Sequence, residues 1–138
     1  MICLYCNGST QVVNSRPQHK ATQVWRRRKC EECGRLFSTN ERIDLSKALM
    51  IRKSETEVEP FVREKLLLSI YRSVGHRKTA INDSTAITDT ICSKLIKSST
   101  SPIIEVEYLV KLVTNTLNTF DKPAGVHYKA YNPIAKSS

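Results

Sequence analysis

Glycine is scarce in this chain, and its four glycines stand far apart, at Gly8, Gly34, Gly75 and Gly125. A phosphate-binding loop of the G-x-x-x-x-G-K-[ST] or G-x-G-x-x-G type needs clustered glycines, because only glycine lets the backbone approach the phosphates closely. Neither pattern occurs, and no Ser/His/Asp or Cys/His set stands in a recognisable nucleophile context. Nothing therefore indicates catalysis, and we expect the chain not to be an enzyme.

Long apolar runs are also missing. No stretch approaches the ~18 consecutive apolar residues that a membrane-spanning helix needs. The first residues carry neither the basic segment nor the apolar segment of a secretory signal peptide. We therefore expect no membrane partner and a cytoplasmic location, associated with the nucleoid if the chain binds DNA.

Acidic residues are outnumbered, with 13 Asp and Glu against 22 Lys and Arg and a net charge of +9. A balance this basic favours a polyanionic partner such as a nucleic acid. The chain has 138 residues, which is enough for one domain or for two small ones.

Cysteine occurs in a pattern. Cys3 and Cys6 form one C-x-x-C pair, and Cys30 and Cys33 form a second pair after 23 intervening residues. Each pair lets two thiolates from one tight turn reach the same ion, and two pairs complete the tetrahedral sulfur shell that Zn²⁺ prefers. A disulfide or redox role suits one isolated pair, but two pairs without a βαβ pattern predict one structural zinc. We interpret the fifth cysteine, Cys92, as a small buried side chain on a helix.

The segment between and after the cysteine pairs predicts a small ribbon of β-hairpins. We expect strands at residues 10–14 and 23–29, a polar loop from Ser15 to about Thr22, and a closing strand at 35–39. Such a ribbon buries little apolar surface, so the metal must replace a hydrophobic core. His19 is not expected to be a ligand, because four thiolates already fill the site.

The strand that leads into Cys30 is strongly basic. Because side chains alternate along a strand, Arg26 and Arg28 point to one side while Arg27 and Lys29 point to the other. Arginine suits phosphate oxygens and the O6/N7 edge of guanine, although a merely solvated basic strand is the alternative. Trp25 either stacks on a base or, as we prefer, packs on the ribbon core. The predicted DNA-binding residues are Arg16, Arg26, Arg27, Arg28, Lys29 and Arg35.

Composition changes after Ser46, which we take as the end of the first domain. Residues 48–51 and 57–59 predict a β-hairpin. Helical periodicity follows at residues 63–74, from about Asn82 or Asp83, at 105–120, and from Pro123 onward. The apolar stripes of these helices predict a small core, with residues 97–102 as a loop. The inward side chains are expected to include Leu66, Ile70, Tyr71, Val74, Ile87, Ile91, Leu95, Val110, Val113, Leu117, Phe120, Val126, Tyr128 and Tyr131.

Two of these segments together resemble a known family. The ribbon is similar to the N-terminal domain of NrdR, the bacterial transcriptional repressor of ribonucleotide reductase operons, and the following stretch resembles the opening of an ATP-cone. The matching motifs are Cys3-x-x-Cys6, Asn14-Ser15-Arg16, Arg26-Arg27-Arg28-Lys29-Cys30-x-x-Cys33, Phe37-Ser38-Thr39-Asn40-Glu41, and Lys53 through Glu59-Pro60-Phe61-Val62-Arg63-Glu64-Lys65-Leu66.

The resemblance implies a mechanism. Zinc ribbons of this family bind paired operator boxes in double-stranded DNA, while the cone binds ATP or dATP and sets the oligomer. Carried over by position, Lys53 and Lys65 would meet the phosphates, Ile51 would line the adenine or sugar region, and Glu59 would lie in the same pocket. Cationic side chains are also what a triphosphate requires where no glycine-rich loop supplies N–H groups. We accordingly expect a homo-oligomer with adenine nucleotides as regulatory ligands.

The sequence departs from the family at three places. Trp25 stands where the family usually has an arginine, and the cone hairpin reads Lys-Ser-Glu-Thr in place of Lys-Arg-Asp-Gly. The second cation and the turn glycine of the family's hairpin are therefore absent, and an acid, Glu55, lies near the expected phosphates. The C-terminal segment, which is usually rich in Arg-Phe and Tyr, reads Val-His-Tyr-Lys-Ala-Tyr at residues 126–131.

The sequence as a whole predicts an α+β chain. Residues 1–46 form a small four-cysteine zinc ribbon that binds DNA, and residues 47–138 form an ATP-cone-like helical bundle with a β-hairpin. Two other functions stay open. The ribbon could dock on a protein complex beside a degenerate cone, or it could bind RNA, because an arginine cluster alone does not distinguish these partners.

Overall fold

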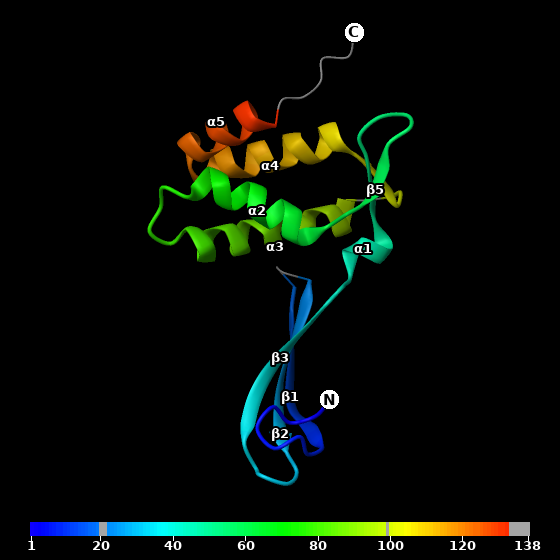
Figure 1. Ribbon diagram of the computed structural model, residues 1–138, viewed down its shortest axis with the longest axis vertical. Coiled ribbons are helices and arrows are strands. Elements are labelled where there is room, and N and C mark those ends of the chain that lie inside the picture. Colours follow the sequence, from blue (N-terminus) through cyan, green and yellow to red (C-terminus); the bar gives the residue numbers. More distant parts are fainter. Residues whose placement is uncertain (20–21, 99, 133–138) are drawn as a thin grey trace. The chain divides into compact units, whose positions relative to one another are not determined.

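The computed structural model describes residues 1–19, 22–98 and 100–132. The chain divides into two compact units, Met1–Ile43 and Asp44–Ser138, and each is described here by itself. Strands make up the first unit, while the second combines helices with a small sheet (Figure 1). The predicted α+β class is therefore confirmed.

The first unit is a three-stranded antiparallel sheet in the order β1-β2-β3. Its strands are β1 (Thr10–Gln18), β2 (Gln23–Cys30) and β3 (Leu36–Arg42), and the central β2 pairs with both neighbours. The polar loop expected from Ser15 is wrong, because β1 continues through Pro17 to Gln18 opposite β2. Pro17 is tolerated there because β1 is an edge strand and a proline nitrogen has no ladder bond to donate on the open side.

Little of the first unit is buried. Among its described residues only Cys3, Gly8 and Cys30 are buried, while Val12 and Val13 are exposed and Phe37 is half-buried. Apolar burial of this extent cannot offset the conformational entropy of more than forty ordered residues. The cysteine cage takes the place of a core, as the sequence predicted.

The second unit opens with a short helix and a small mixed sheet. Helix α1 (Leu45–Ala48) precedes β4 (Met50–Arg52), which pairs antiparallel with β5 (Val58–Pro60) and parallel with β6 (Ile103–Glu105). The sheet order is β5-β4-β6. The predicted hairpin is confirmed with a small shift, but α1 and β6 were not expected, since residues up to 102 were read as loop and helix was predicted from 105.

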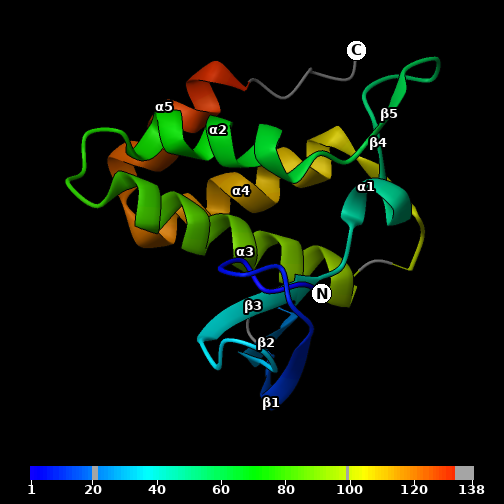
Figure 2. The same ribbon diagram turned by 60° about the horizontal axis from the view of Figure 1, so that its bottom comes forward.

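Four helices form most of the core of this unit. They are α2 (Arg63–Val74), α3 (Ala80–Ser98), α4 (Val106–Phe120) and α5 (Lys122–Tyr131). Each packs on two others in the cyclic order α2-α3-α4-α5, and α2 lies beside α3 in both ribbon views (Figures 1 and 2). The core residues are Leu45, Leu49, Ile51, Phe61, Leu66, Ile70, Val74, Ala80, Ile87, Ile91, Cys92, Leu95, Ile104, Val110, Val113, Leu117, Ala124 and Tyr128.

Most of the predicted apolar stripes are confirmed, but four of their outer members are not buried. Tyr71, Phe120, Val126 and Tyr131 all keep more than a third of their surface exposed. They lie at the margins of stripes that are narrower than the periodicity suggested. The second predicted helix also begins earlier than expected, at Ala80, in place of a start capped by residue 82 or 83.

Candidate metal centre and nucleic-acid interface

The first C-x-x-C pair sits in a tight turn built from backbone hydrogen bonds. The Cys3 N–H donates to the Gly8 carbonyl at 2.8 Å, and the Asn7 N–H donates to the Cys3 carbonyl at 2.9 Å. Asn7 has φ = 62°, a left-handed conformation that asparagine tolerates better than most residues. This turn directs Cys3 and Cys6 to the same side.

The second pair repeats this geometry. The Cys30 N–H donates to the Arg35 carbonyl at 3.0 Å, and the Gly34 N–H donates to the Cys30 carbonyl at 3.2 Å. Gly34 occupies the position of Asn7 in the first turn and has φ = 73°. Two equivalent turns therefore face each other, as four-sulfur coordination requires.

The four sulfurs are close enough for one ion. The Cys3 and Cys33 Sγ atoms are 3.8 Å apart, and those of Cys6 and Cys30 are 3.4 Å apart. All four ligand atoms lie within 4.8 Å of one another. A regular tetrahedron with Zn–S bonds of ~2.3 Å has sulfur–sulfur edges of about 3.8 Å. The four cysteines thus fit a single zinc ion.

Backbone N–H groups point at these sulfurs and favour thiolates. The Tyr5 N–H donates to Cys3 Sγ at 3.3 Å, and the Glu32 and Cys33 N–H groups each donate to Cys30 Sγ at 3.4 Å. The bond from Cys33 is the main reason why the pKa of the Cys30 thiol falls to about 6. Such second-shell bonds orient ligands and raise metal affinity.

The pKa of the Cys6 thiol shifts in the opposite direction, upward. The backbone N–H of Gly8 lowers its pKa, but the hydrogen bond to Cys30, burial and the other two thiols raise it to about 12. With no cation beside it, this shift favours the protonated form of the Cys6 thiol. A bound cation of charge +2 reverses this preference, because a coordinating thiol is deprotonated outright.

The strand register sorts the basic side chains of the ribbon onto two faces. Residues directly opposite each other in a sheet share a face. The pairing of Asn14 and Ser38 with Arg27, and of Arg16 and Asn40 with Trp25, defines one of them. We call this side the tryptophan face; its members are Arg16, Trp25, Arg27, Lys29 and Arg42. The other side, the Glu41 face, carries Arg26, Arg28 and Glu41.

Both arginines of the Glu41 face have partners within the sheet. The Arg26 Nη2 atom forms a salt bridge with Glu41 Oε2 at 3.1 Å. The Arg28 Nε atom donates to Thr39 Oγ1 at 3.4 Å. This face therefore presents partly neutralised and partly covered cations.

The tryptophan face is more strongly basic. Arg16, Arg27 and Lys29 are exposed, and no Asp or Glu occupies any of its paired positions along the described strands. Trp25 is half-buried on this face. Arg35 belongs to neither face: it lies in the second cysteine turn with its guanidinium 4.9 Å from the centre of the Tyr5 ring.

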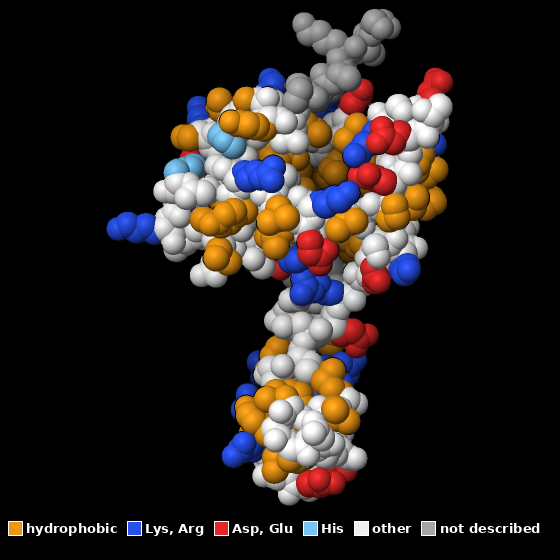
Figure 3. Space-filling view, in the orientation of Figure 1, with side chains coloured by type: hydrophobic (Ala, Val, Ile, Leu, Met, Phe, Trp, Pro, Cys, Tyr) orange, Lys and Arg blue, Asp and Glu red, His pale blue; other side chains and the backbone are white. Residues whose placement is uncertain are grey.

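The second unit brings three of the four predicted nucleotide residues together. The Glu59 carboxylate oxygen Oε1 lies 3.1 Å from Lys53 Nζ and 3.8 Å from Lys65 Nζ. Figure 3 shows basic and acidic side chains side by side where the β4–β5 hairpin meets α2. The fourth residue, Ile51, pairs with Glu59 across the hairpin but is buried in the core.

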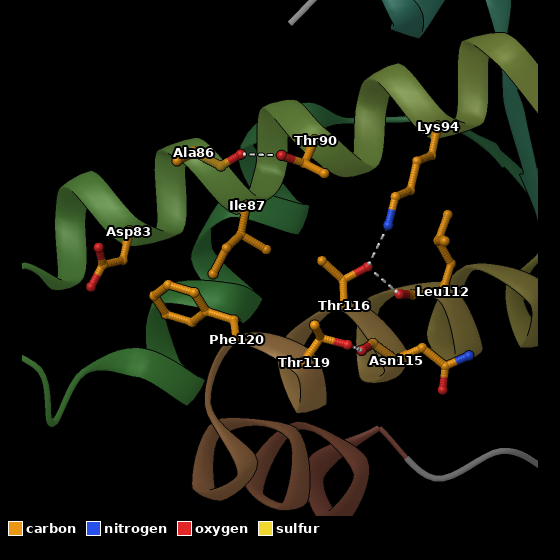
Figure 4. Close-up of a pocket in the computed structure, with 10 residues that line it drawn as sticks. All are labelled: Asp83, Ala86, Ile87, Thr90, Lys94, Leu112, Asn115, Thr116, Thr119 and Phe120. Carbon is orange, nitrogen blue, oxygen red and sulfur yellow. Dashed lines mark hydrogen bonds between the residues drawn. The ribbon is translucent and has the colours of Figure 1, made fainter. Parts of the chain in front are cut away.

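A groove that the sequence did not indicate lies between α3 and α4. It has a volume of about 550 Å³. Its apolar floor includes Ile87, Leu112 and Phe120, and Lys94 reaches across it to donate to Thr116 Oγ1 at 3.4 Å (Figure 4). None of the four predicted nucleotide residues lines this groove.

The sequence did not indicate how the basic residues are divided between the two faces of the sheet. Glu41 belongs to one of the motifs that resemble the family, yet its salt bridge with Arg26, which partly neutralises one face of the sheet, was not expected. A β-bulge between Val12 and Asn14 determines the face on which Arg16 lies, and no pattern in the local sequence predicts this bulge.

No helix in the described part of the chain is long and apolar enough to cross a membrane.

Two tight turns with four converging thiolates, joined by a three-stranded sheet, define the class of zinc-ribbon proteins. Residues 1–41 match the family described as "Transcriptional repressor NrdR-like, N-terminal domain".

The likeness extends beyond the ribbon. The chain is 37% identical over 130 residues to the transcriptional repressor NrdR of Ligilactobacillus salivarius, which covers 93% of this chain and 81% of that protein. It is 36% identical over 130 residues to the NrdR of Levilactobacillus brevis, with 93% and 76% covered. With the NrdR of Natronomonas pharaonis it shares 34% identity over 137 residues, with 96% and 83% covered. The chain belongs to the NrdR family of transcriptional repressors.

Proposed function

We propose that the chain is a zinc-dependent, DNA-binding repressor of ribonucleotide reductase genes that responds to ATP and dATP. The observation that carries the proposal is the tryptophan face, an acid-free basic surface on a sheet anchored by the cysteine cage. The names of the relatives support DNA as the partner. The family resemblance supplies the reductase genes and the nucleotides.

In this proposal zinc acts structurally, by linking the two cysteine turns. The turns hold the Cys30 end of β2 and its neighbouring strands, so that Arg27 and Lys29 keep fixed positions on the sheet. Exposed guanidinium and ammonium groups then neutralise DNA phosphates and release their counterions. A narrow β-ribbon also fits the major groove, where an arginine fork reads guanine. Arg27 is the residue best placed for such a contact.

The nucleotide half of the proposal rests on the second unit. Lys53 directly follows β4 and Lys65 lies in the first turn of α2, and both ammonium groups approach the same carboxylate. A triphosphate offers more negative charge than one carboxylate and would bind both lysines. The bound nucleotide would then bias the oligomer and so the spacing of paired ribbons on the operator.

The test is binding to a fluorescent duplex that carries the paired boxes upstream of the reductase genes. The full chain should bind this duplex more tightly than a scrambled duplex, and the RNA duplex of the same sequence should not compete. Calorimetry with ATP and dATP tests the sensing half, with Lys53→Ala as the variant that should lose affinity. Equal binding to RNA and DNA, or no preference for the boxes, would contradict the DNA assignment.

Docking on a protein complex has one observation in its favour. The cysteine turns expose Leu4, Tyr5 and Leu36, which keep 64%, 50% and 44% of their surface accessible. A ribbon that docks through these side chains would stay bound to its protein partner in excess DNA. A ribbon that binds DNA would be released, so competition distinguishes the two functions.

A further inference from the structure

Trp25 is a large apolar side chain at the centre of a polar surface. It lies on the central strand β2, with Arg16 opposite it on β1 and Asn40 opposite it on β3. Two residues away along β2, and on the same face, are Gln23 and Arg27. The rows on either side of Trp25 are completed on the outer strands by Asn14, Gln18, Ser38 and Arg42. The eight positions that surround Trp25 on the tryptophan face are therefore all polar or charged.

These surroundings do not suit a core residue. A tryptophan that fills an apolar core packs against other apolar side chains, whereas the same-face neighbours of Trp25 are polar groups and the stems of long side chains. The ring is half-buried, so part of it remains accessible on the side that also presents the exposed Arg16 and Arg27. Trp25 thus offers an apolar contact to whatever binds this basic face.

The neighbouring side chains are of the types that recognise base edges in the major groove. Arginine pairs with guanine, asparagine and glutamine pair with adenine, and an apolar side chain contacts the C5 methyl group of thymine. The neighbours of Trp25 include three arginines and four amide side chains, which can make the first two kinds of contact. Trp25 is the member of the group that can make the third.

The spacing along β2 matches the stacking of base pairs. Side chains two residues apart on one face of a strand are separated by about 6.7 Å, because each residue rises ~3.3–3.4 Å. Base pairs of B-DNA are stacked ~3.4 Å apart, so two steps cover about 6.8 Å. With β2 lying along the groove, Trp25 and Arg27 can therefore contact bases at the same time, two base pairs apart.

We propose that Trp25 is a specificity-determining residue that packs on the methyl group of a thymine in the major groove. This inference rests on the proposed DNA-binding function and adds a sequence preference to it. The contact removes water from the methyl group and from the accessible part of the indole ring. Uracil in place of that thymine removes the contact and leaves every hydrogen bond of the base pair unchanged.

Fluorescence anisotropy with modified duplexes tests the contact. Each thymine of the paired boxes upstream of the reductase genes is replaced in turn by uracil, which lacks only the C5 methyl group. Loss of one buried methyl group should weaken binding of the full chain about fourfold for each box at the contacted position. Replacement of the other thymines should leave the affinity nearly unchanged.

Trp25→Ala and Val24→Ala form a matched pair of variants. Both shorten a half-buried apolar side chain of β2, but Val24 lies on the opposite face, paired with Glu41 and Pro17. Trp25→Ala should bind the thymine and uracil duplexes equally, whereas Val24→Ala should keep the wild-type difference. Neither variant changes the charge, so both should keep the wild-type salt slope, and native mass spectrometry should show one zinc ion per chain.

A second measurement uses the wild-type chain and needs no variant. When 5-bromouracil replaces the contacted thymine, its bromine occupies the place of the methyl group. Ultraviolet irradiation of the complex should then cross-link the base to Trp25, which peptide mass spectrometry identifies. A cross-link to a different residue would overturn the inference, even if Trp25→Ala failed to retain zinc.

The other contrary results are equally distinct. The same loss on uracil replacement in Trp25→Ala and in wild type means that Trp25 does not touch the methyl group. Tighter binding of the single strands than of the duplex assigns Trp25 to stacking on an unpaired base instead. If wild type prefers the boxes but tolerates uracil at every position, the thymine contact fails alone. If wild type does not prefer the boxes at all, the DNA-binding proposal itself fails.

Discussion

Removal of zinc should unfold the ribbon and leave the second unit folded. Among the described residues of the first unit only Cys3, Gly8 and Cys30 are buried, whereas the second unit has a continuous core that runs from Leu45 to Tyr128. Structural zinc contributes ~10–16 kcal/mol in small zinc-binding peptides, which exceeds the whole stability expected of such a ribbon. The second unit has no comparable dependence on the metal.

The chain contains a built-in probe for this prediction. Its single tryptophan, Trp25, lies on β2 of the ribbon, while all the long helices belong to the second unit. Excess EDTA should shift Trp25 emission to longer wavelength as the side chain becomes fully hydrated. The helical circular dichroism signal and its thermal transition should stay unchanged. Zinc added in excess of the chelator should restore the Trp25 emission.

Substitution of a ligand should reproduce the effect of the chelator. Cys30→Ser should give the hydrated Trp25 emission without EDTA, because three thiolates no longer complete the shell. Cys92→Ala is the matched control, since Cys92 is a buried cysteine on α3 of the second unit. It should leave the emission unchanged. Loss of the helical signal together with the Trp25 shift would refute the independence of the two units, and an EDTA-insensitive emission would refute the structural role of zinc.

Two further predictions concern the second unit. Gly125→Ala should destabilise it by about 1–3 kcal/mol in thermal denaturation, because the new Cβ would overlap the side-chain oxygen of Asn118 on α4 and lie 3.0 Å from the Asn118 backbone nitrogen. Gly75→Ala is the control, because its new Cβ would approach no atom closer than 3.4 Å, and it should be neutral or slightly stabilising. Hydrogen bonds from Thr79 and Arg77 hold the pKa of Asp83 below its ordinary value, so its contribution is present at neutral pH and is lost as pH falls through the folded pKa. Asp83→Asn should accordingly lower the melting temperature at pH 7, and the difference from wild type should shrink below about pH 4; a constant difference across this range would contradict the assignment.

The long helices could be predicted because their apolar residues recur at helical spacing over many turns. Helix α4 shows this best, with Val110, Val113 and Leu117 all buried as expected. Strand β6 has only three residues, and its parallel partner β4 lies about fifty residues away, so no local pattern indicates it. Helix α1 is a single turn, capped by the Asp44 carboxylate that accepts the Ser46 N–H at 3.1 Å.

The metal site could be predicted almost completely, because cysteine spacing encodes the turn geometry directly. The proposed nucleic-acid surface could be predicted only in part. Alternation along β2 separates Arg27 from Arg26, but the bulge at Val13 changes the pairing of β1. Had the register near Thr10 continued without the bulge, Arg16 would lie opposite Val24, on the Glu41 face. The one extra residue of the bulge thus determines which cations lie on the same face of the sheet.

The central claim, that the tryptophan face binds DNA, is tested most directly by the salt dependence of duplex binding in two double variants. Arg27→Ala with Lys29→Ala removes two cations from the tryptophan face, and Arg26→Ala with Arg28→Ala removes two from the Glu41 face. Both variants carry the same net charge and leave the cysteine cage intact. Each lost phosphate contact should reduce the slope of log K against log salt concentration by about 0.9.

We predict that the Arg27 and Lys29 variant loses most of its affinity and about two units of salt slope. The Arg26 and Arg28 variant should keep a slope close to that of the wild type, since its cations are already engaged within the sheet. Equal losses in the two variants would mean that only total charge matters. A larger loss in the Arg26 and Arg28 variant would place the DNA on the opposite face and contradict the account.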